Sequence, residues 1–336
     1  MKETTGAALG AIFAEMGRQA DDARASFDRS GEVAEALAAS ARRTGRLVLL
    51  GMGGSHAVNR AVEPSYRGAG LDATAHPVSE LLRAPLPHAP RTVLLASQSG
   101  ESGEIVAYLE TDATGEERFG LSLNPDGVLA DRVASLIGHG GMEQAFAATR
   151  SLYVSLALHA RVLHELGVFQ RRWLDAPAQH RRGDIDAAAA VLSGATAVIV
   201  SGRGATQGLA EAAALGLLEL ARMPAFALEG GQVRHGPLEA LGPSLAIVLI
   251  RQPEDADTTA SLAGIARSAG SPVVVIDISG SAPVGEAASI ILPQAAGMAA
   301  VFAVLPALQA LIIATARRRV ADVGAPLRSA KVTRDL

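Results

Sequence analysis

The sequence contains no cysteine among its 336 residues. This absence excludes disulfide bonds, zinc sites with thiolate ligands and a cysteine nucleophile. Aromatic side chains make up only 3% of the chain, whereas aliphatic side chains are abundant. Lysine and arginine number 30 against 34 aspartates and glutamates, and no basic block or stripe occurs. This balance of charge argues against a nucleic-acid partner.

Signals for a membrane or for export are also scarce. Residues 295–316 form the one uncharged segment long enough to span a bilayer, but Pro306 and Gln309 lie in its middle. We therefore expect a helix buried in a globular core or a subunit interface, and no membrane partner. The N-terminus carries Glu3 and Glu15 around a short apolar stretch and lacks the apolar core and cleavage site of a secretory signal. The sequence thus predicts an amphipathic N-terminal helix and a cytoplasmic protein.

Short aliphatic runs alternate with helical patterns along most of the chain. The expected strands are residues 46–51, 92–97, 118–124, 196–202, 245–251 and 272–277. Helices are expected to begin near Ser55, Gly103 and Thr206, and a long one to cover residues 144–167. Continuous aliphatic strands joined by helices are typical of parallel sheets that are covered on both faces. The predicted fold class is α/β.

The two halves of the chain repeat one pattern. Residues 46–57 (RLVLLGMGGSHA) and 196–207 (TAVIVSGRGATQ) each combine a strand, a Gly-x-Gly turn and a helix start. Two copies of one α/β unit fit the length better than one large sheet. The expected organisation is an N-terminal helical segment 1–30, a first domain 31–168, a linker 169–183, a second domain 184–320 and a C-terminal tail 321–336.

Loops rich in glycine and serine follow three of the predicted strands: GMGGSHA, SQSGES and SGRGATQ. In open parallel sheets, ligands bind outside the carboxyl ends of the strands. Backbone N–H groups at a helix start and serine hydroxyls hold anions, and glycine permits close approach. SQSGES contains no cationic residue, so it favours a phosphomonoester held by neutral donors. Alternatively, Ser97, Ser99 and Ser102 serve only as helix caps and turn formers.

Nucleotide motifs are absent from these loops. The Walker pattern is missing because no Gly-Lys-Ser/Thr occurs, and His56 takes the third glycine position of the dinucleotide fingerprint. None of the eight histidines shows metal-ligand spacing, so we predict no metal site.

Two residues of the second half are candidates for acid–base chemistry. Glu219 lies in an apolar helical stretch, where burial would raise its pKa into a useful range. His235 lies in a turn-like RHGP sequence and could transfer a proton near neutral pH. Alternatively, Glu219 pairs with Arg222 three residues on, and His235 is an ordinary loop histidine. On pattern alone, Lys331 is a solvated charge of the tail.

Taken together, these motifs resemble the sugar isomerase (SIS) family over almost the whole chain. The matching motifs are GMGGSHA, SQSGES, GGMEQAFAATR, SGRG, EGGQVRHGPL and the terminal SAKVT. Within the family, the chain is similar to the isomerase half of the fructose-6-phosphate amidotransferases, to aminosugar-phosphate deaminases and to fructosamine-phosphate deglycases. The resemblance implies two tandem SIS domains, each a parallel sheet between two helical layers.

The resemblance also implies roles for single residues. Substrate and phosphate binding fall to Gly53, Ser55, Ser97, Gln98, Ser99, Ser102 and Glu143. Glu219 would move a proton between C1 and C2, His235 would open the sugar ring, and Lys331 would form a Schiff base with the ketose. In the family, the histidine typically reaches the site from a neighbouring subunit, which implies a homodimer with shared sites. The implied ligand is a hexose 6-phosphate, and no cofactor is required.

Two departures from the amidotransferase pattern shape the expected reaction. Gly216 and Ala212 stand where that pattern has a lysine and a glutamate, and the sequence holds no glutaminase domain with its cysteine. We therefore expect release of ammonia instead of amide transfer, with glucosamine 6-phosphate converted to fructose 6-phosphate. The alternatives are a fructosamine-6-phosphate deglycase with a wider pocket beside Gly216, a ketose/aldose isomerase, and a phosphosugar sensor without catalysis.

Overall fold

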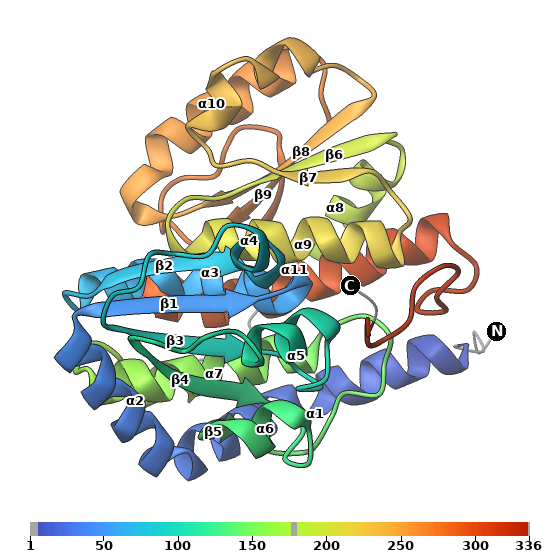
Figure 1. The fold of residues 1–336 in the computed structure, drawn as a ribbon. Helices are drawn as coiled ribbons and strands as arrows, with labels where there is room; N and C mark the ends of the chain where they lie inside the picture. Colours follow the sequence, from blue (N-terminus) through green and yellow to red (C-terminus); the bar gives the residue numbers. More distant parts are fainter. Residues whose placement is uncertain (1–5, 176–179, 335–336) are drawn as a thin grey trace. The chain divides into compact units, whose positions relative to one another are not determined.

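The computed structural model describes residues 6–175 and 180–334. The chain divides into two compact units (Figure 1). The N-terminal unit comprises Gly10–Leu174 and the tail Pro326–Leu336, and the C-terminal unit comprises Met1–Leu9 and Asp175–Ala325. Three short stretches lie outside the described residues. They are residues 1–5 of the expected segment 1–30, residues 176–179 of the expected linker, and residues 335–336 of the expected tail. The predicted domain boundaries stay predictions.

The N-terminal unit is built on a parallel sheet of five strands in the order β2-β1-β3-β4-β5. The strands are β1 (Arg46–Gly51), β2 (Asp72–Pro77), β3 (Arg91–Ala96), β4 (Glu116–Ser122) and β5 (Ser135–Ile137). One face packs against α2 (Gly31–Thr44), α3 (Gly53–Gly68) and α7 (Arg150–Glu165), and the other against α4 (Val78–Arg83), α5 (Gly103–Leu109) and α6 (Val128–Arg132). The N-terminal helix α1 covers Ala7–Arg29.

The C-terminal unit has a second parallel sheet of five strands, in the order β10-β9-β8-β6-β7. The strands are β6 (Ala197–Ser201), β7 (Ala225–Ala227), β8 (Leu245–Arg251), β9 (Val273–Asp277) and β10 (Ala288–Ile291). In Figure 1, helix α10 (Ala256–Ser268) covers one face, and α8 (Arg182–Ser193) and α9 (Ala205–Leu220) cover the other. Helix α11 (Gly297–Arg319) packs against α8 and α9. Short 3₁₀ turns cover Arg171–Asp175, Gln232–Arg234, Pro237–Ala240 and Pro253–Asp255.

The two sheets share one topology. Numbered by their appearance within each unit, the strands of both sheets run in the order 2-1-3-4-5. The predicted α/β class is confirmed, and the repeated strand–Gly-x-Gly–helix pattern corresponds to β1–α3 in one unit and β6–α9 in the other. In both sheets the strand order reverses between the first and third strands, which is where such folds bind ligands.

All six predicted strands exist, but four strands were missed. The missed strands β2, β5, β7 and β10 are the four edges of the two sheets. The helix expected at 144–167 is wrong at its start, because α7 begins at Arg150 and residues 144–149 form a loop. The reason is that the carboxylate of Glu143 accepts hydrogen bonds from Thr149 N and Arg150 N, which ends the loop and starts the helix there.

The long apolar segment forms α11, the one helix of the described residues with the length and hydropathy of a membrane span. Of its most apolar window, 72% is buried, and the helix packs against α8 and α9 of the same unit. This burial agrees with the expected core helix. A cytoplasmic location stays a prediction.

Candidate functional site

The serine loop, residues 97–102, leaves the carboxyl end of β3 at the point where the strand order of the first sheet reverses. Ser97 and Ser99 are nearly buried, with 7% and 5% of their surface exposed, while Gln98 and Ser102 are half-buried. Gly100 has a φ of +68°, so the loop turns through a backbone conformation that glycine adopts without strain. The sequence prediction of a polar loop at this sheet edge is therefore confirmed in position.

The hydroxyl groups of the loop remain able to donate hydrogen bonds. Ser97 Oγ accepts the N–H of Gly100 at 3.1 Å, and Ser99 Oγ accepts that of Glu101 at 3.2 Å. An accepting hydroxyl keeps its own hydrogen, which can be donated to an anion. Ser102 occupies the N-cap position of α5 but makes no capping hydrogen bond with its side chain. The turn-forming role that we considered as an alternative thus holds for two of the serines and does not exclude anion binding.

The end of the neighbouring strand β4 holds the serine loop in shape. Leu123 N donates to Gln98 O at 3.1 Å, and the side-chain amide of Asn124 donates to Ser99 O at 3.0 Å. These bonds use carbonyl groups of the loop and leave the hydroxyl hydrogens of Ser97 and Ser99 uncommitted. A preorganised set of neutral donors is suited to phosphoryl oxygens.

A second loop begins beside the first. Gly51 of β1 pairs with Ala96 of β3, so the turn at Met52 and Gly53 starts next to the serine loop. Gly53 is exposed with a φ of +49°, and Ser55, which is half-buried, lies in the first turn of α3. The sheet thus brings the predicted phosphate-binding residues of both motifs to one edge.

Glu143 and Lys331 meet within the N-terminal unit. Lys331 Nζ lies 3.3 Å from Glu143 Oε2 and donates to Phe146 O at 3.2 Å. Glu143 is 2% exposed, and its oxygens also accept hydrogen bonds from Thr149 and Ser151. Donors of the chain itself thus surround this carboxylate, and its predicted part in substrate binding stays a prediction.

The C-terminal tail also contacts the serine loop. Thr333 O accepts the N–H of Gly103, the first residue of α5, at 3.1 Å, and Arg334 lies 2.7 Å from Glu101. Lys331 lies two residues before Thr333, and a residue spans at most about 3.6 Å. The backbone of Lys331 is therefore held close to the serine loop. The interpretation of Lys331 as a solvated tail charge is wrong, because its side chain is only 26% exposed.

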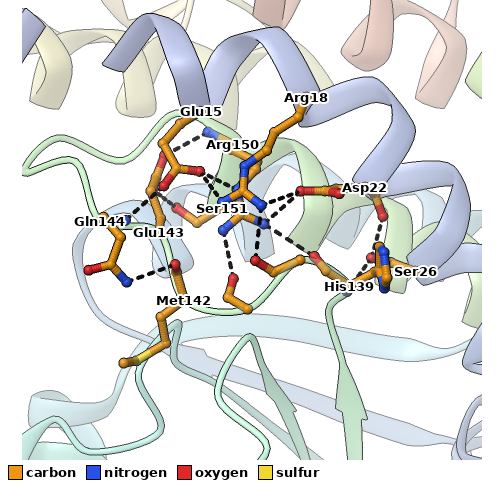
Figure 2. Close-up of polar contacts among 12 residues, drawn as sticks. Glu15, Arg18, Asp22, Ser26, His139, Met142, Glu143, Gln144, Arg150 and Ser151 are labelled. Atoms are coloured by element: carbon orange, nitrogen blue, oxygen red, sulfur yellow. Dashed lines mark hydrogen bonds and ion pairs between the residues drawn. The ribbon is translucent and has the colours of Figure 1, made fainter. Parts of the chain in front are cut away.

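A buried arginine that the sequence analysis missed supports this arrangement (Figure 2). Arg150 is fully buried at the start of α7 and pairs with Glu15 at 2.5 Å and with Asp22 at 3.1 Å, both from α1. Its other terminal nitrogen donates to Gly141 O at 2.6 Å. The guanidinium thus fixes the loop that carries Glu143 to α1. A cationic residue in the matched motif GGMEQAFAATR was the available signal.

The carboxyl group of Glu15, which pairs with Arg150, is ionised. Burial alone would raise the pKa of Glu15, but hydrogen bonds from Gln144 N and from Arg150 outweigh it and hold this pKa below its ordinary value. Glu15 therefore keeps its charge opposite Arg150 at neutral pH.

Glu219 and His235 belong to the C-terminal unit. Glu219 is half-buried in α9, and the partner that we considered for it, Arg222, is bonded to Asp322 at 2.9 Å. His235 is exposed in the loop between two 3₁₀ turns. In the same loop, Glu229 accepts the N–H groups of Gly231 and Gln232 and so shapes the approach to the histidine.

The expected wider pocket beside Gly216 is wrong. A Cβ atom added to Gly216 would lie 3.1 Å from Ile312 Cδ1. Ile312 comes from α11, which packs along α9, so the space left by the missing lysine is filled by a core side chain.

The equivalent switch point of the second sheet is nearly closed. The cavity between the SGRG loop and β8 measures about 10 Å³, room for about one water molecule. Asp255 lines this cavity, and Arg203 Nε pairs with Glu229 at 3.2 Å. Within the described residues, no cluster of three or more histidine, aspartate or glutamate side chains could hold a metal ion.

Comparisons with known proteins agree with this description. Residues 191–316 match the family model of the SIS domain. The glutamine–fructose-6-phosphate aminotransferase of Synechocystis sp. is 29% identical over 215 residues, which cover 55% of this chain and 34% of that protein. The chain thus matches about a third of the length of this relative.

Two solved structures share the fold over nearly all of both chains. The C-terminal domain of glucosamine-fructose-6-phosphate aminotransferase from Francisella tularensis has a TM-score of 0.82 at 17% identity and covers 97% of this chain and 100% of its own. A glucosamine-6-phosphate deaminase from Thermotoga maritima has a TM-score of 0.74 at 15% identity, with coverages of 96% and 99%. Together with the match over residues 191–316, these findings confirm the resemblance of the chain to the SIS family.

Proposed function

We propose that the protein is an aminosugar-phosphate isomerase that converts glucosamine 6-phosphate into fructose 6-phosphate and ammonia. The observation that carries this proposal is the meeting of the tail and the serine loop. Thr333 O binds Gly103 N at the end of the serine loop, and Lys331, two residues earlier, is held on the buried Glu143. Neutral phosphate donors beside a primary amine suit a sugar phosphate with a reactive carbonyl carbon. The names of the relatives refer to the same class of substrate.

In this proposal, the serine loop holds the phosphate. Ser97 and Ser99 donate their free hydroxyl hydrogens, Ser102 donates from the start of α5, and Gln98 and Ser55 complete the set. Binding by fixed donors places the sugar in one orientation, which accounts for a large part of the catalysis of such a reaction.

The proton-transfer groups are assigned from the motifs alone. His235 opens the ring of the sugar. Glu219 takes the proton from C2 and returns it to C1, which turns the aldehyde with its C2 amine into a ketose imine. Water adds to this imine and ammonia leaves. Lys331 condenses with the C2 carbonyl of the ketose form with loss of water, and hydrolysis of this Schiff base releases fructose 6-phosphate and the free amine.

Among the alternatives, the deglycase loses its structural support. It depended on extra space beside Gly216 for an amino-acid moiety, and Ile312 fills that space. A ketose/aldose isomerase would use the same proton transfer without loss of ammonia, and a sensor would bind the ligand without turnover.

We also propose that the N-terminal unit is a second SIS domain and that two chains form a dimer with shared sites. The family model covers only residues 191–316, but the two units have the same strand order. The exposed position of His235 is consistent with a role toward a second chain.

The test is a coupled assay for fructose 6-phosphate and ammonia with glucosamine 6-phosphate as substrate. We expect turnover by the wild type, a loss of at least about 100-fold in Glu219→Gln, and about 10-fold weaker substrate binding in Ser99→Ala, from the loss of one hydrogen bond to a charged group. Ser193→Ala, whose hydroxyl bonds only to a nearby carbonyl, is the matched control. Full activity in Glu219→Gln, or turnover only with fructose 6-phosphate or a 6-phosphofructosyl amine, would contradict the proposal.

A further inference from the structure

A cavity of about 240 Å³ opens in the N-terminal unit, at the opposite end of the sheet from the serine loop. Arg91 and Glu116, the first residues of β3 and β4, form its floor, and it is walled by α4, α5 and the segment before β3. The serine loop follows the last residue of β3, about 20 Å along the six-residue strand. The cavity is therefore separate from the candidate active site.

The walls of the cavity are apolar. Leu81 and Tyr108 belong to the core cluster between the sheet and helices α4 and α5, and Leu82 and Leu86 pack against this cluster and line the opening. A molecule that fills the cavity must therefore have an apolar body. Cavities of about 150 Å³ accept a benzene-sized molecule, so the volume here suits one ring with a short side chain.

The hydrogen-bond donors of the floor are already engaged. Glu116 accepts the phenol O–H of Tyr108 at 3.0 Å and pairs with Arg91 at 2.9 Å and with Arg118 at 2.7 Å. The remaining nitrogens of Arg118 donate to carbonyl groups at the end of α5, including Thr111 O at 3.2 Å. The floor thus has little capacity left to bind an anionic or carbonyl group.

Acceptors remain available at the mouth. Asp112 Oδ1 takes the N–H and the hydroxyl of Thr114, and no contact in the described part of the chain engages the second oxygen. His88 Nδ1 lies 3.3 Å from Thr114 O. Because a carbonyl only accepts, this nitrogen carries the hydrogen, and Nε2 of the neutral ring is an acceptor. The chemistry left open is that of a partner that donates hydrogen bonds.

We propose that this cavity binds a small organic amine, with the apolar body between Leu82, Leu86 and Tyr108 and the ammonium group on Asp112. The hydrogen bonds from Thr114 hold the pKa of Asp112 below its ordinary value, so the carboxylate is charged at neutral pH. The inference does not depend on the proposed reaction.

The experiment is calorimetric titration of the full chain with three probes of one shape: 2-phenylethylamine, 2-phenylethanol and 3-phenylpropionate. We expect one amine site per chain, weaker binding of the alcohol and the weakest binding of the carboxylate. Asp112→Asn should weaken the amine about 2- to 5-fold, as for an exposed ion pair, and leave the alcohol unchanged. Leu82→Trp should fill the cavity and abolish binding, whereas Leu218→Trp, at an exposed leucine of the other unit, should not.

Three results would overturn the proposal. They are equal affinity for the three probes, no binding of any of them, and amine binding that persists in a folded Leu82→Trp variant. If Leu82→Trp does not fold, Asp112→Asn decides alone, because this exposed substitution leaves the core intact. An unchanged amine affinity in Asp112→Asn then refutes the placement of the ammonium group.

Discussion

The contact between Lys331 and Glu143 can be tested by a double-mutant cycle. At 3.3 Å and an effective dielectric constant of about 20, the two charges attract each other by about 5 kcal/mol. Lys331 is 26% exposed and the pair loses hydration, so we expect a net coupling of about 1–2 kcal/mol. The cycle combines Glu143→Gln with Lys331→Met.

The single variants should differ in cost. In Glu143→Gln, the amide oxygen still accepts from Thr149 and Arg150, but its NH₂ group faces the hydroxyl of Ser151 and the ammonium of Lys331. The hydroxyl can turn to accept, whereas the ammonium cannot. We expect a loss of about 2–4 kcal/mol in unfolding free energy for Glu143→Gln and about 0.5–1.5 kcal/mol for Lys331→Met.

Urea unfolding followed by tryptophan fluorescence reports on the N-terminal unit, which contains Glu143 and Lys331. Trp173 is the one tryptophan of the chain and lies in the N-terminal unit, with its ring 5.1 Å from that of Phe169. Arg334→Ala is the matched control, because Arg334 lies on the same tail but pairs with Glu101. The loss of unfolding free energy in Arg334→Ala should add to that in Glu143→Gln within about 0.5 kcal/mol. A Glu143–Lys331 coupling no larger than that of the control would refute the placement of Lys331.

Two further predictions concern the cores of the units. Gly216→Lys should lower the unfolding free energy of the C-terminal unit by about 1–3 kcal/mol through contact with Ile312. Ile312→Ala should relieve part of this loss in calorimetry. Additive losses from the two substitutions would contradict the contact. Burial lowers the pKa of His159, which is bonded to Tyr66, to about 3, while the unfolded chain titrates near 6.5. As pH falls, the unfolded state binds the proton first, so the stability present above pH 6.5 should decrease by about 2 kcal/mol by pH 5. His159→Phe should lack this decrease in urea titrations monitored at Trp173, and an equal decrease would contradict the assignment.

The strands that sequence reasoning recovered differ physically from those it missed. The central strands are buried on both faces and have continuous aliphatic runs, as in the fully buried stretch of Leu47 and Leu49. The edge strands pair on one side only, and their sequences reflect this. Strand β2 reads DATAHP, and β7 carries Phe226 with 58% of its surface exposed. Such segments lack the hydrophobic periodicity on which a strand prediction depends.

The sequence predicted the loops of the candidate site but not the long-range contacts that hold them in place. SQSGES could be recognised because small hydroxyl residues directly follow a buried strand. No periodicity connects Lys331 with Glu143 or Arg150 with Glu15, since these pairs are separated by 188 and 135 residues. Contacts of this range follow from tertiary packing. The family resemblance assigned a role to Lys331, and only the structure supplies its buried partner.

The two units show that an identical topology does not produce an identical site. Both sheets reverse their strand order at the same place, and the loop there in the N-terminal unit carries two serine hydroxyls that accept hydrogen bonds and keep their own hydrogens. At the equivalent point of the C-terminal unit, Gln252 donates to the carbonyl of Arg203, and Asp255 closes the turn by accepting Gln252 N. These contacts occupy the side-chain amide of Gln252, and Asp255 adds a carboxylate that would repel an anion. We therefore expect the side chains of each loop, and not the sheet edge alone, to determine whether an anion binds there.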